Sequence, residues 1–507
     1  MLSKSQPDEI QSYLADASNL RGGHAARVVF PETSQEVADA LLEAARAGVP
    51  VTVAGAGTGI VGGRVPFGGI VLATERLNRI KEITREESGG RAIAEPGVVL
   101  TDFQRAVEAQ GFLYPPDPTE RSCYLGATVA TNSSGARTFK YGPTRRHVRR
   151  LKVALTTGDV LDLRRGAIRA DANGKLRIPL DRGRVIEAQL PSYRMPQTRK
   201  HVAGYYVAPQ MDALDLFIGS EGTLGVVTEI ETALLPKPEG VLSGVVFFKD
   251  EDSLLAFVRE ARTRSLESRA AGRTGAFDAR ALEYFDVEAL RFLSERYALV
   301  PRDATAGAIF FEQETTDQTE DQLLADWHAL LQKHEALLDR SWFATEESDQ
   351  ARIREFRHHL PVLVNEWLAR HNQRKVSTDM AVPDEHFPAM LRFYAESLRE
   401  SRLRHVTFGH IGDNHVHVNI MPRDAGEAAR AREIYMQFVR RAVNLGGTIS
   451  AEHGVGKIKR DYLRELYGKE HLREMAALKR AFDPACILGR GNIFAEEYLG
   501  KEVDSSQ

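Results

Sequence analysis

The stretch GHIGDNHVHVN, residues 409–419, carries three histidines and an asparagine. From His415 onward, the polar residues His415, His417 and Asn419 alternate with valine and isoleucine. In a β-strand this alternation places the polar side chains on one face and the apolar ones against a core. A solvated edge strand would show the same pattern, so the imidazoles alone do not identify a metal site.

A second polar segment, SAEHGVGK at residues 450–457, adds a carboxylate and another imidazole flanked by glycines. Zinc and similar divalent ions take imidazole nitrogen and carboxylate oxygen, and a catalytic site keeps positions open for substrate. His410, His417 and Glu452 are therefore predicted to supply three ligands, with zinc or manganese as the ion. His453, beside the metal but not on it, would be a general base. His415 is expected to support the ligands rather than to be a fourth one.

Three glycine-rich segments precede these motifs. AGAGTGIVGG, residues 54–63, matches G-x-G-x-x-G after a predicted strand, but a Rossmann loop requires a helix next, and the strand IVLAT follows instead. The other two are LGATVATNSSGARTFKYG at 125–142 and FIGSEGTLGVVTEI at 217–230. Glycine allows backbone N–H groups to approach a ligand closely, so the three loops together indicate a long phosphorylated cofactor.

These loops, with PPDPTE at 115–120 between the first two, resemble the FAD-binding domain of the vanillyl-alcohol oxidase and p-cresol methylhydroxylase superfamily. Within it, the chain is most similar to the D-lactate, D-2-hydroxyglutarate and glycolate dehydrogenase group. The resemblance implies noncovalent FAD, because Thr58 stands where covalent flavoproteins often carry histidine. The residues implied in FAD binding are Gly55, Ala56, Gly57, Thr58, Gly59, Pro116, Asp117, Gly126, Thr128, Thr131, Asn132, Ser134, Gly135, Glu221, Gly222, Val227 and Asn492.

The same resemblance implies roles for the polar motifs, since G-H-x-G-D-x-x-x-H-x-N and E-H-G-x-G carry the metal site of these dehydrogenases. Oxidation of a 2-hydroxy acid requires removal of a hydroxyl proton whose pKa lies about 9 units above that of histidine, or about 12 kcal/mol. A divalent ion would remove most of that mismatch. His453 would be the base, Asn419 would orient it or the substrate, and Arg354 would bind the substrate carboxylate.

The substrate is expected to be a D-2-hydroxy acid, with D-lactate favoured over glycolate or D-2-hydroxyglutarate. Relatives acting on the dicarboxylate carry a lysine where this chain has Ser377. Three alternatives stay open. An alkyl-dihydroxyacetone-phosphate synthase-like transferase would not need His410 and His417, a zinc hydrolase would be colourless, and a noncatalytic flavin subunit would not be bleached by any hydroxy acid.

Composition sets limits on partners and location. The formal net charge of −3 gives no reason to expect nucleic acid, and two cysteines cannot hold an iron–sulfur cluster alone. No signal-peptide core or long apolar run occurs, which favours the cytoplasm, with peripheral contact at the inner membrane face as an alternative. The expected partners are a 2-hydroxy acid and an electron acceptor, either a quinone, an electron-transfer flavoprotein or a cytochrome. A homodimer is left open.

An α+β fold in three parts is predicted: a two-subdomain FAD-binding domain over 25–237, an α+β substrate or cap domain over 240–465, and a C-terminal helical segment over 466–507 that returns toward the flavin. Thr33 with Glu36 predicts a capped helix ending at Gly48, and Thr101 with Gln104 a second one ending at Gly111. The prolines of LLPKPEG, residues 234–240, suggest a boundary.

The run TRRHVRR, residues 144–150, is unusually basic. A solvated loop is the expected interpretation. The functional alternative is a docking patch for an acidic electron acceptor or a membrane surface, with Arg145 and Arg146 as its centre.

Overall fold

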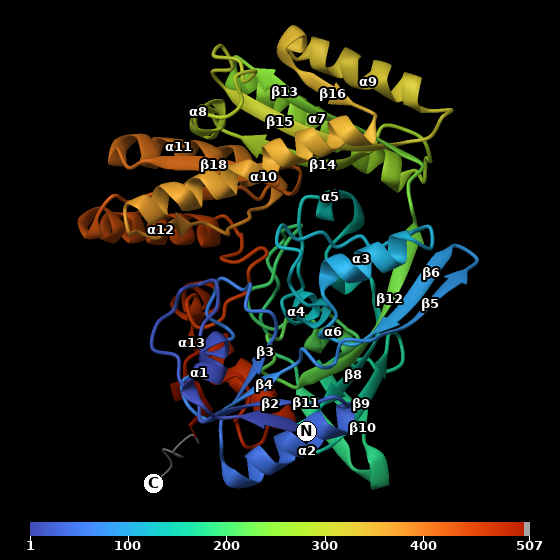
Figure 1. Ribbon diagram of the computed structural model, residues 1–507, viewed down its shortest axis with the longest axis vertical. Helices are drawn as coiled ribbons and strands as arrows, with labels where there is room; N and C mark the ends of the chain where they lie inside the picture. The colour runs from blue at the N-terminus through green and yellow to red at the C-terminus, as the bar shows by residue number, and fades with distance from the viewer. Residues whose placement is uncertain (501–507) are drawn as a thin grey trace.

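The computed structural model describes residues 1–500, which form two halves stacked along the long axis of the molecule (Figure 1). The lower half contains two β-sheets and a hairpin built from the first part of the chain, and the upper half contains one large sheet covered by helices. The chain passes from the lower to the upper half between Pro236, which ends β12 (Val226–Pro236), and Gly240, which begins β13 (Gly240–Phe248). The predicted α+β class is confirmed.

The first sheet of the lower half has the order β1-β2-β4-β3. Its strands are β1 (Leu2–Lys4), β2 (Arg27–Phe30), β4 (Ile70–Ala73) and β3 (Val51–Ala54). Helix α2 (Ser34–Ala47) packs its apolar stripe against this sheet. It begins where the Thr33 hydroxyl accepts a hydrogen bond from the Glu36 N–H and ends at Gly48, which has φ 63°. The helix predicted at 33–48 is therefore confirmed.

The first glycine loop lies between β3 and β4, which are parallel neighbours. No helix follows the loop before β4 begins at Ile70, as the sequence predicted. The Rossmann interpretation fails for this reason, because no helix N-terminus follows the glycines to face a pyrophosphate.

The second sheet of the lower half has the order β5-β6-β12-β8-β9, with β7 (Phe112–Leu113) paired to the end of β12. Its other strands are β5 (Ile80–Glu86), β6 (Gly89–Ala94), β8 (Val148–Ala154) and β9 (Val160–Arg164). The hairpin of β10 (Lys175–Pro179) and β11 (Val185–Gln189) lies beside this sheet. The short helices α4 (Leu125–Ala130) and α5 (Thr138–Tyr141) belong to the second glycine segment, and α6 (Ala213–Phe217) ends where the third segment begins.

The capping box predicted for the second helix is wrong. Helix α3 spans Leu100–Glu108, and its N-cap residue, Val99, makes no side-chain capping bond. The Thr101 hydroxyl instead donates to the Arg121 carbonyl at 2.9 Å, and the Gln104 amide donates to the Pro116 carbonyl at 3.1 Å. Tertiary contacts to the following loop therefore use the two side chains that the local pattern assigned to the helix start.

The sheet of the upper half has seven strands in the order β16-β13-β15-β14-β18-β19-β17. Helices α7 (Glu251–Ala270) and α9 (Glu320–Lys333) share one core with the sheet, where Trp327 stacks on Phe311 at 3.9 Å between ring centroids. Helices α8 (Val287–Ser294) and α10 (Glu347–Arg370) share a second core with it. The remaining strands are β14 (Ala279–Phe285), β15 (Gly307–Thr315), β16 (Trp342–Ala344), β17 (Val376–Ser377), β18 (His405–Gly409) and β19 (His417–Ile420).

Strand β19 carries the end of the histidine stretch and lies between β18 and β17. All four of its residues are buried, including His417 and Asn419. The solvated edge strand considered as an alternative is therefore wrong. Helices α11 (Phe387–Ser401) and α12 (Ala425–Asn444) pack on one another beside these strands.

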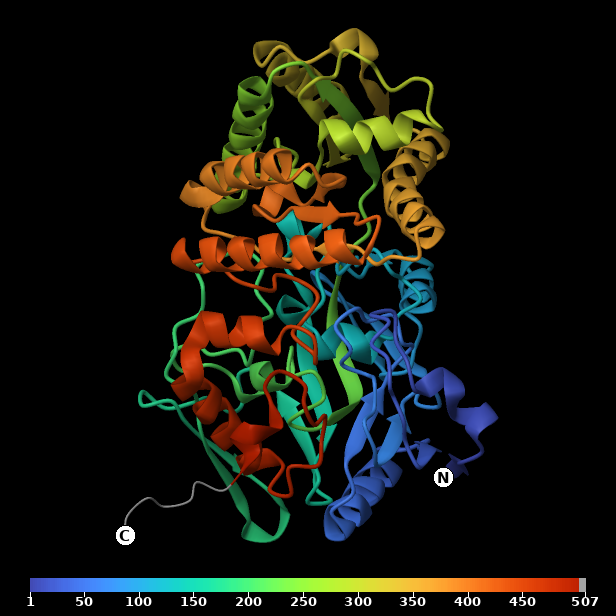
Figure 2. The same ribbon diagram turned by 90° about the vertical axis from the view of Figure 1, so that its left-hand side faces the viewer.

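Helix α13 (Arg460–Phe482) brings the chain back to the lower half, where it packs against β11 (Figure 2). The helix is broken at Gly468, which has φ 74°. The boundary predicted at 466 falls inside this helix, and residues 501–507 of the predicted last segment lie outside the described residues. None of the helices over residues 1–500 combines the length and apolarity needed to cross a bilayer.

Candidate active site

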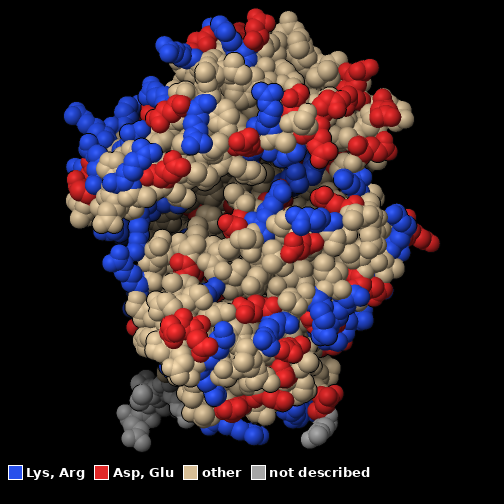
Figure 3. Space-filling model, viewed as in Figure 1, with Lys and Arg blue, Asp and Glu red and all other residues tan. Residues whose placement is uncertain are grey.

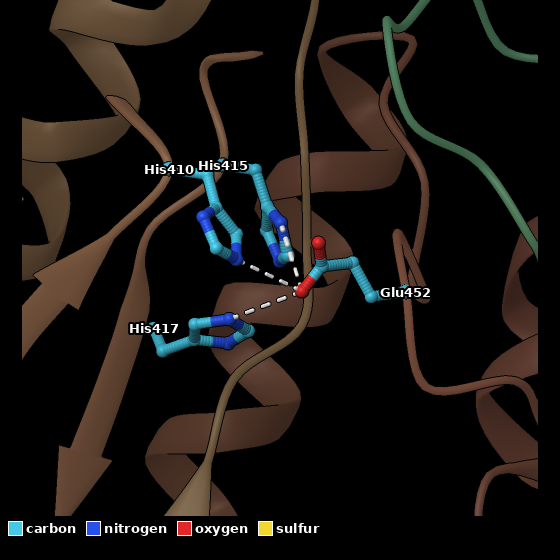
Figure 4. A group of neighbouring side chains, drawn as sticks. All are labelled: His410, His415, His417 and Glu452. Atoms are coloured by element: carbon cyan, nitrogen blue, oxygen red, sulfur yellow. Dashed lines mark hydrogen bonds and ion pairs between the residues drawn. The ribbon is translucent and has the colours of Figure 1, made fainter. Parts of the chain in front are cut away.

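Three imidazoles converge on one carboxylate oxygen between the two halves (Figure 4). The Oε2 atom of Glu452 lies 3.1 Å from His410 Nε2, 3.5 Å from His417 Nε2 and 3.9 Å from His415 Nδ1. His410 follows β18 and His417 begins β19, so one tight turn holds both, while Glu452 lies on the loop between α12 and α13. The predicted ligands His410, His417 and Glu452 thus come together, and their donor set suits a divalent ion.

The other oxygen of Glu452 is held by the lower half. Oε1 accepts hydrogen bonds from Ser134 Oγ at 2.9 Å and from Lys200 Nζ at 2.6 Å. Burial raises the pKa of Glu452, but cationic His410 and Lys200 outweigh burial and hold this pKa well below its ordinary value. Glu452 is therefore an ionised carboxylate with one oxygen fixed and the other directed at the imidazoles. Lys200, whose side chain has no exposed surface, was not found from sequence.

His410 is oriented by a second buried carboxylate. Its Nδ1 lies 2.6 Å from Glu283 Oε1, and the other oxygen of Glu283 accepts from Arg357 Nη2 at 2.8 Å. Burial disfavours the imidazolium, but Glu283 and Glu452 outweigh burial and raise the pKa of His410 to about 9. A carboxylate on the far nitrogen of a histidine is the arrangement that fixes metal-binding imidazoles in other proteins.

His415 lies in the same cluster but in a different electrostatic environment. It has no exposed surface, and its Nε2 lies 3.2 Å from Asp379 Oδ1. Burial lowers the pKa of His415 to about 3, so the ring stays neutral. The structure therefore places His415 beside the three predicted ligands and in contact with Asp379.

Asp379, which sequence reasoning did not single out, organises the E-H-G segment. Its buried carboxylate accepts hydrogen bonds from the backbone N–H groups of Glu452 and His453, at 3.1 and 3.0 Å, and from Lys459 Nζ at 2.6 Å. His453 Nδ1 lies 3.3 Å from Asp379 Oδ2, and burial lowers the pKa of His453 to about 4. His453 is thus a neutral imidazole held at Nδ1. The signal in the sequence was a lone aspartate in KVSTDMAVP.

Two adjoining cavities meet at this cluster, and Figure 3 shows the surface hollowed between the two halves. The larger, of about 270 Å³, is lined by His410, His417, Glu452, His453 and Arg357. The smaller, of about 160 Å³, is lined by the first glycine loop and the third. Residues that line both cavities are Thr58, Gly59, Ala127, Thr131 and His453. His453 therefore lies where the polar cluster and the glycine loops meet.

Most of the residues predicted to bind FAD line these cavities. Those on the smaller cavity are Gly55, Ala56, Gly57, Thr58, Gly59, Gly126, Thr131, Glu221, Gly222 and Val227, and Thr128 and Ser134 line the larger one. The glycine loops with their threonine hydroxyls thus line two adjoining cavities, which suits a phosphorylated cofactor.

Five predicted residues lie outside the lining. Gly135 packs against the Asp117 carbonyl, which leaves no room for a Cβ, and the Pro116 carbonyl accepts a hydrogen bond from the Gln104 amide. Asn132 accepts from the Arg145 N–H through Oδ1, and Asn492 donates to the Gly63 carbonyl at 3.0 Å. These five residues therefore contact other parts of the protein and line neither cavity.

The predicted substrate-binding residues are not all at the cavity. Arg357 lines the larger cavity, whereas Arg354, one turn earlier on α10, does not and lies 3.5 Å from Gln350 Oε1. Asn419 is buried beneath the site and donates to the His417 carbonyl at 3.2 Å.

The solvated-loop interpretation of residues 144–150 is wrong. The Arg145 side chain is only 14% exposed, donates to the Ile218 carbonyl and Asp215, and lies 4.0 Å from the centroid of the Tyr206 ring. His147 is buried, and Arg149 and Arg150 are paired with Glu86 and Glu229, respectively. Only Arg146 of this run projects a free charge, so the structure offers no basic patch of the predicted kind here.

Comparison with known proteins agrees with this arrangement. Residues 25–164 match the model of an FAD binding domain, and residues 237–493 match that of the C-terminal domain of FAD linked oxidases. The glycolate oxidase subunit GlcD of Bacillus subtilis is 32% identical over 475 residues, covering 93% of this chain and 89% of that protein. A D-lactate dehydrogenase of Anaerostipes hadrus is 29% identical over 497 residues, covering 96% and 93% of the two chains.

The chain is also similar to a third curated protein and to a solved structure. A D-2-hydroxyglutarate dehydrogenase of Stutzerimonas stutzeri is 27% identical over 507 residues, covering 96% of this chain and 95% of that protein. A solved structure of alkyldihydroxyacetonephosphate synthase superposes with a TM-score of 0.62 at 17% identity, covering 92% of this chain and 77% of that one, which shows the fold. The chain belongs to the FAD-linked oxidases, as an FAD-binding oxidoreductase of the p-cresol methylhydroxylase type whose relatives oxidise hydroxy acids.

Proposed function

We propose that this protein is an FAD-dependent dehydrogenase of a D-2-hydroxy acid, with D-lactate favoured, which uses a divalent ion, zinc or manganese, and passes electrons to an acceptor other than NAD. The observation that carries the proposal is the convergence of His410 and His417 on Glu452 Oε2 at the end of a cavity that adjoins the glycine loops. A transferase would have no use for this donor set.

The chain supplies a site for each part of the reaction. FAD, held without a covalent bond, would accept the hydride from C2 of the substrate at N5 of its ring. A divalent ion on His410, His417 and Glu452 would act as a Lewis acid that makes a hydroxyl more acidic. His453 is neutral and fixed at Nδ1 by Asp379, so it is free to take a proton at Nε2.

The substrate carboxylate would be bound by arginine. Arg354 is the residue that the family resemblance implies, and Arg357 is the one on the wall of the larger cavity. We assign direct contact to Arg357 and a supporting charge one turn away to Arg354. Apolar residues, including Ile60, Phe285 and Phe408, form part of the same wall, which favours a monocarboxylate with a small apolar side chain over a dicarboxylate.

Anaerobic mixing with D- and L-2-hydroxy acids tests the proposal. The flavin band near about 450 nm should bleach with D-lactate and not with L-lactate, and loss of the ion to a chelator should slow bleaching. Bleaching that a chelator does not slow would remove the metal from the proposal. Yellow protein that no acid bleaches, even with added Zn²⁺ or Mn²⁺, would favour the transferase or a noncatalytic subunit.

A further inference from the structure

Arg64, immediately after the first glycine loop, lies on the wall of the smaller cavity. Its Nη1 donates to the Gly55 carbonyl at 2.9 Å, and its Nη2 donates to the Ser12 carbonyl. The guanidinium passes so close to Gly57 that a Cβ built there would lie 2.3 Å from Nη1. The cationic group is therefore held directly against the loop that begins the cofactor site.

Among residues 1–500, the positive charge of Arg64 has no carboxylate in direct contact, and Asp16 and Glu75 attract it only from a longer distance. Within residues 1–500, no Asp or Glu oxygen lies within 4.0 Å of its guanidinium, whereas nearby Arg76 pairs with Glu32 and Arg79 with Glu95. The Nε atom of Arg64 is buried and has no acceptor among residues 1–500. Burying a cation costs free energy unless an anion accompanies it. Arg64 thus keeps one buried N–H donor that an anion in the cavity would satisfy.

The N-terminal segment keeps Arg64 in this position. The Ala17 N–H donates to the Gly57 carbonyl at 2.9 Å, and the Arg64 guanidinium lies 5.4 Å from the centroid of the Tyr13 ring. Ser12, Tyr13 and Asp16 line a further cavity on the outer side of the guanidinium, while the smaller cavity lies on its inner side. Because Asp16 and Glu75 both line the outer cavity, an anion would approach Arg64 from the inner one.

We infer that Arg64 binds the diphosphate of FAD. The diphosphate is the anionic part of that cofactor, and a guanidinium matches phosphate oxygens with paired, directional N–H donors. The inference rests on the FAD-binding domain and not on the identity of the oxidised acid.

Arg64→Met tests the inference by removing the charge while keeping an unbranched side chain. After removal of the flavin, FAD titration should give a Kd about tenfold to a hundredfold weaker than that of the unmodified protein, the loss expected for a charged hydrogen bond. Arg64→Lys keeps the charge but not the paired N–H donors of the guanidinium. Its Kd for FAD should lie between those of Arg64→Met and the unmodified protein. Arg76→Met, which removes an exposed arginine paired outside the cavity, is the matched control and should bind FAD normally.

Competition binding with ADP and adenosine distinguishes direct contact of Arg64 with phosphate from a role of Arg64 in supporting the glycine loop. ADP should displace FAD from the unmodified protein better than adenosine, and Arg64→Met should lose at least about tenfold of that preference. A variant that retains the full preference for ADP over adenosine would overturn the inference, whether or not its affinity for FAD has fallen. Because binding is the readout, the result does not depend on which acid, if any, bleaches the flavin.

Discussion

Two segments of this chain concentrate basic side chains, the run TRRHVRR at residues 144–150 and the stretch GHIGDNHVHVN at residues 409–419, and the fold uses them in opposite ways. In the run, Arg145, Arg149 and Arg150 pair with three separate carboxylates, those of Asp215, Glu86 and Glu229. In the histidine stretch, three imidazoles share one oxygen of Glu452 beside a cavity. Basic density in a sequence therefore predicts a site only when several groups converge on the same point.

The buried histidines of the two segments show the same contrast. Burial lowers the pKa of His147 to about 4, where its ring meets only the Tyr141 carbonyl. Burial acts on His410 as well, but two carboxylates raise the pKa of His410 to about 9. Desolvation decides the charge of His147, whereas two carboxylate partners decide the charge of His410.

The largest expected effect is the loss of activity when the shared oxygen is removed. Glu452→Gln should lower kcat/KM for the hydroxy acid about a thousandfold or more, because a ligand amide cannot replace the charge that holds a Lewis acid worth several kcal/mol. Anaerobic flavin reduction and metal content should fall together. Glu433→Gln, an exposed substitution on α12, should alter neither. Normal metal content in the Glu452 variant would contradict the assignment.

Substitutions in the run TRRHVRR should instead change the free energy of unfolding. Arg145→Met should lower the free energy of unfolding by about 3 kcal/mol, because it breaks a largely buried ion pair and leaves the Ile218 carbonyl without its donor. Denaturant unfolding measures this change, and the flavin of the folded variant should still be reduced. Arg146→Met is the neighbouring control and should lie near the unmodified protein. Equal effects of the two variants on unfolding would contradict the structural role assigned to Arg145.

His147 should make folding sensitive to mild acid. Its folded pKa of about 4 lies below the ordinary value of 6.5, so the unfolded chain takes up a proton first as the pH falls. Its contribution to stability is therefore complete above about pH 6.5 and is lost toward pH 4. Between pH 7 and 5 the loss should be about 2 kcal/mol. His147→Gln should show less of this pH dependence than exposed His328→Gln, and identical slopes would refute the prediction.

The smallest expected effect is a difference in KM between substitutions of two arginines on α10. Arg357→Met should raise KM for the hydroxy acid about tenfold, as loss of one charge-assisted hydrogen bond would, while Arg354→Met should change it less. Steady-state kinetics with each variant measures the difference. A larger effect at Arg354 would favour the assignment that the family resemblance implies over the one that the cavity lining favours.

Local patterns accounted for much of the fold. The Thr33–Glu36 capping box and Gly48 correctly marked α2, and the strand after the first glycine loop correctly excluded a Rossmann fold. The same rule failed at Thr101 and Gln104, whose side chains bind the following loop. A capping pattern depends on residues close together in the sequence. It gives no information about a distant residue that competes for the same side chain.

By itself, the sequence determined the types of residue that converge, namely two histidines in one turn and a carboxylate in a separate glycine-rich segment. Only the tertiary structure decided which oxygen of Glu452 faces them, because Ser134 and Lys200, hundreds of residues earlier in the chain, hold the other. The contacts of Asp379 and Arg64 were decided in the same way. Hydrogen bonds and ion pairs act over a few ångströms in space, and the distance along the chain does not reveal which groups the fold brings within that range.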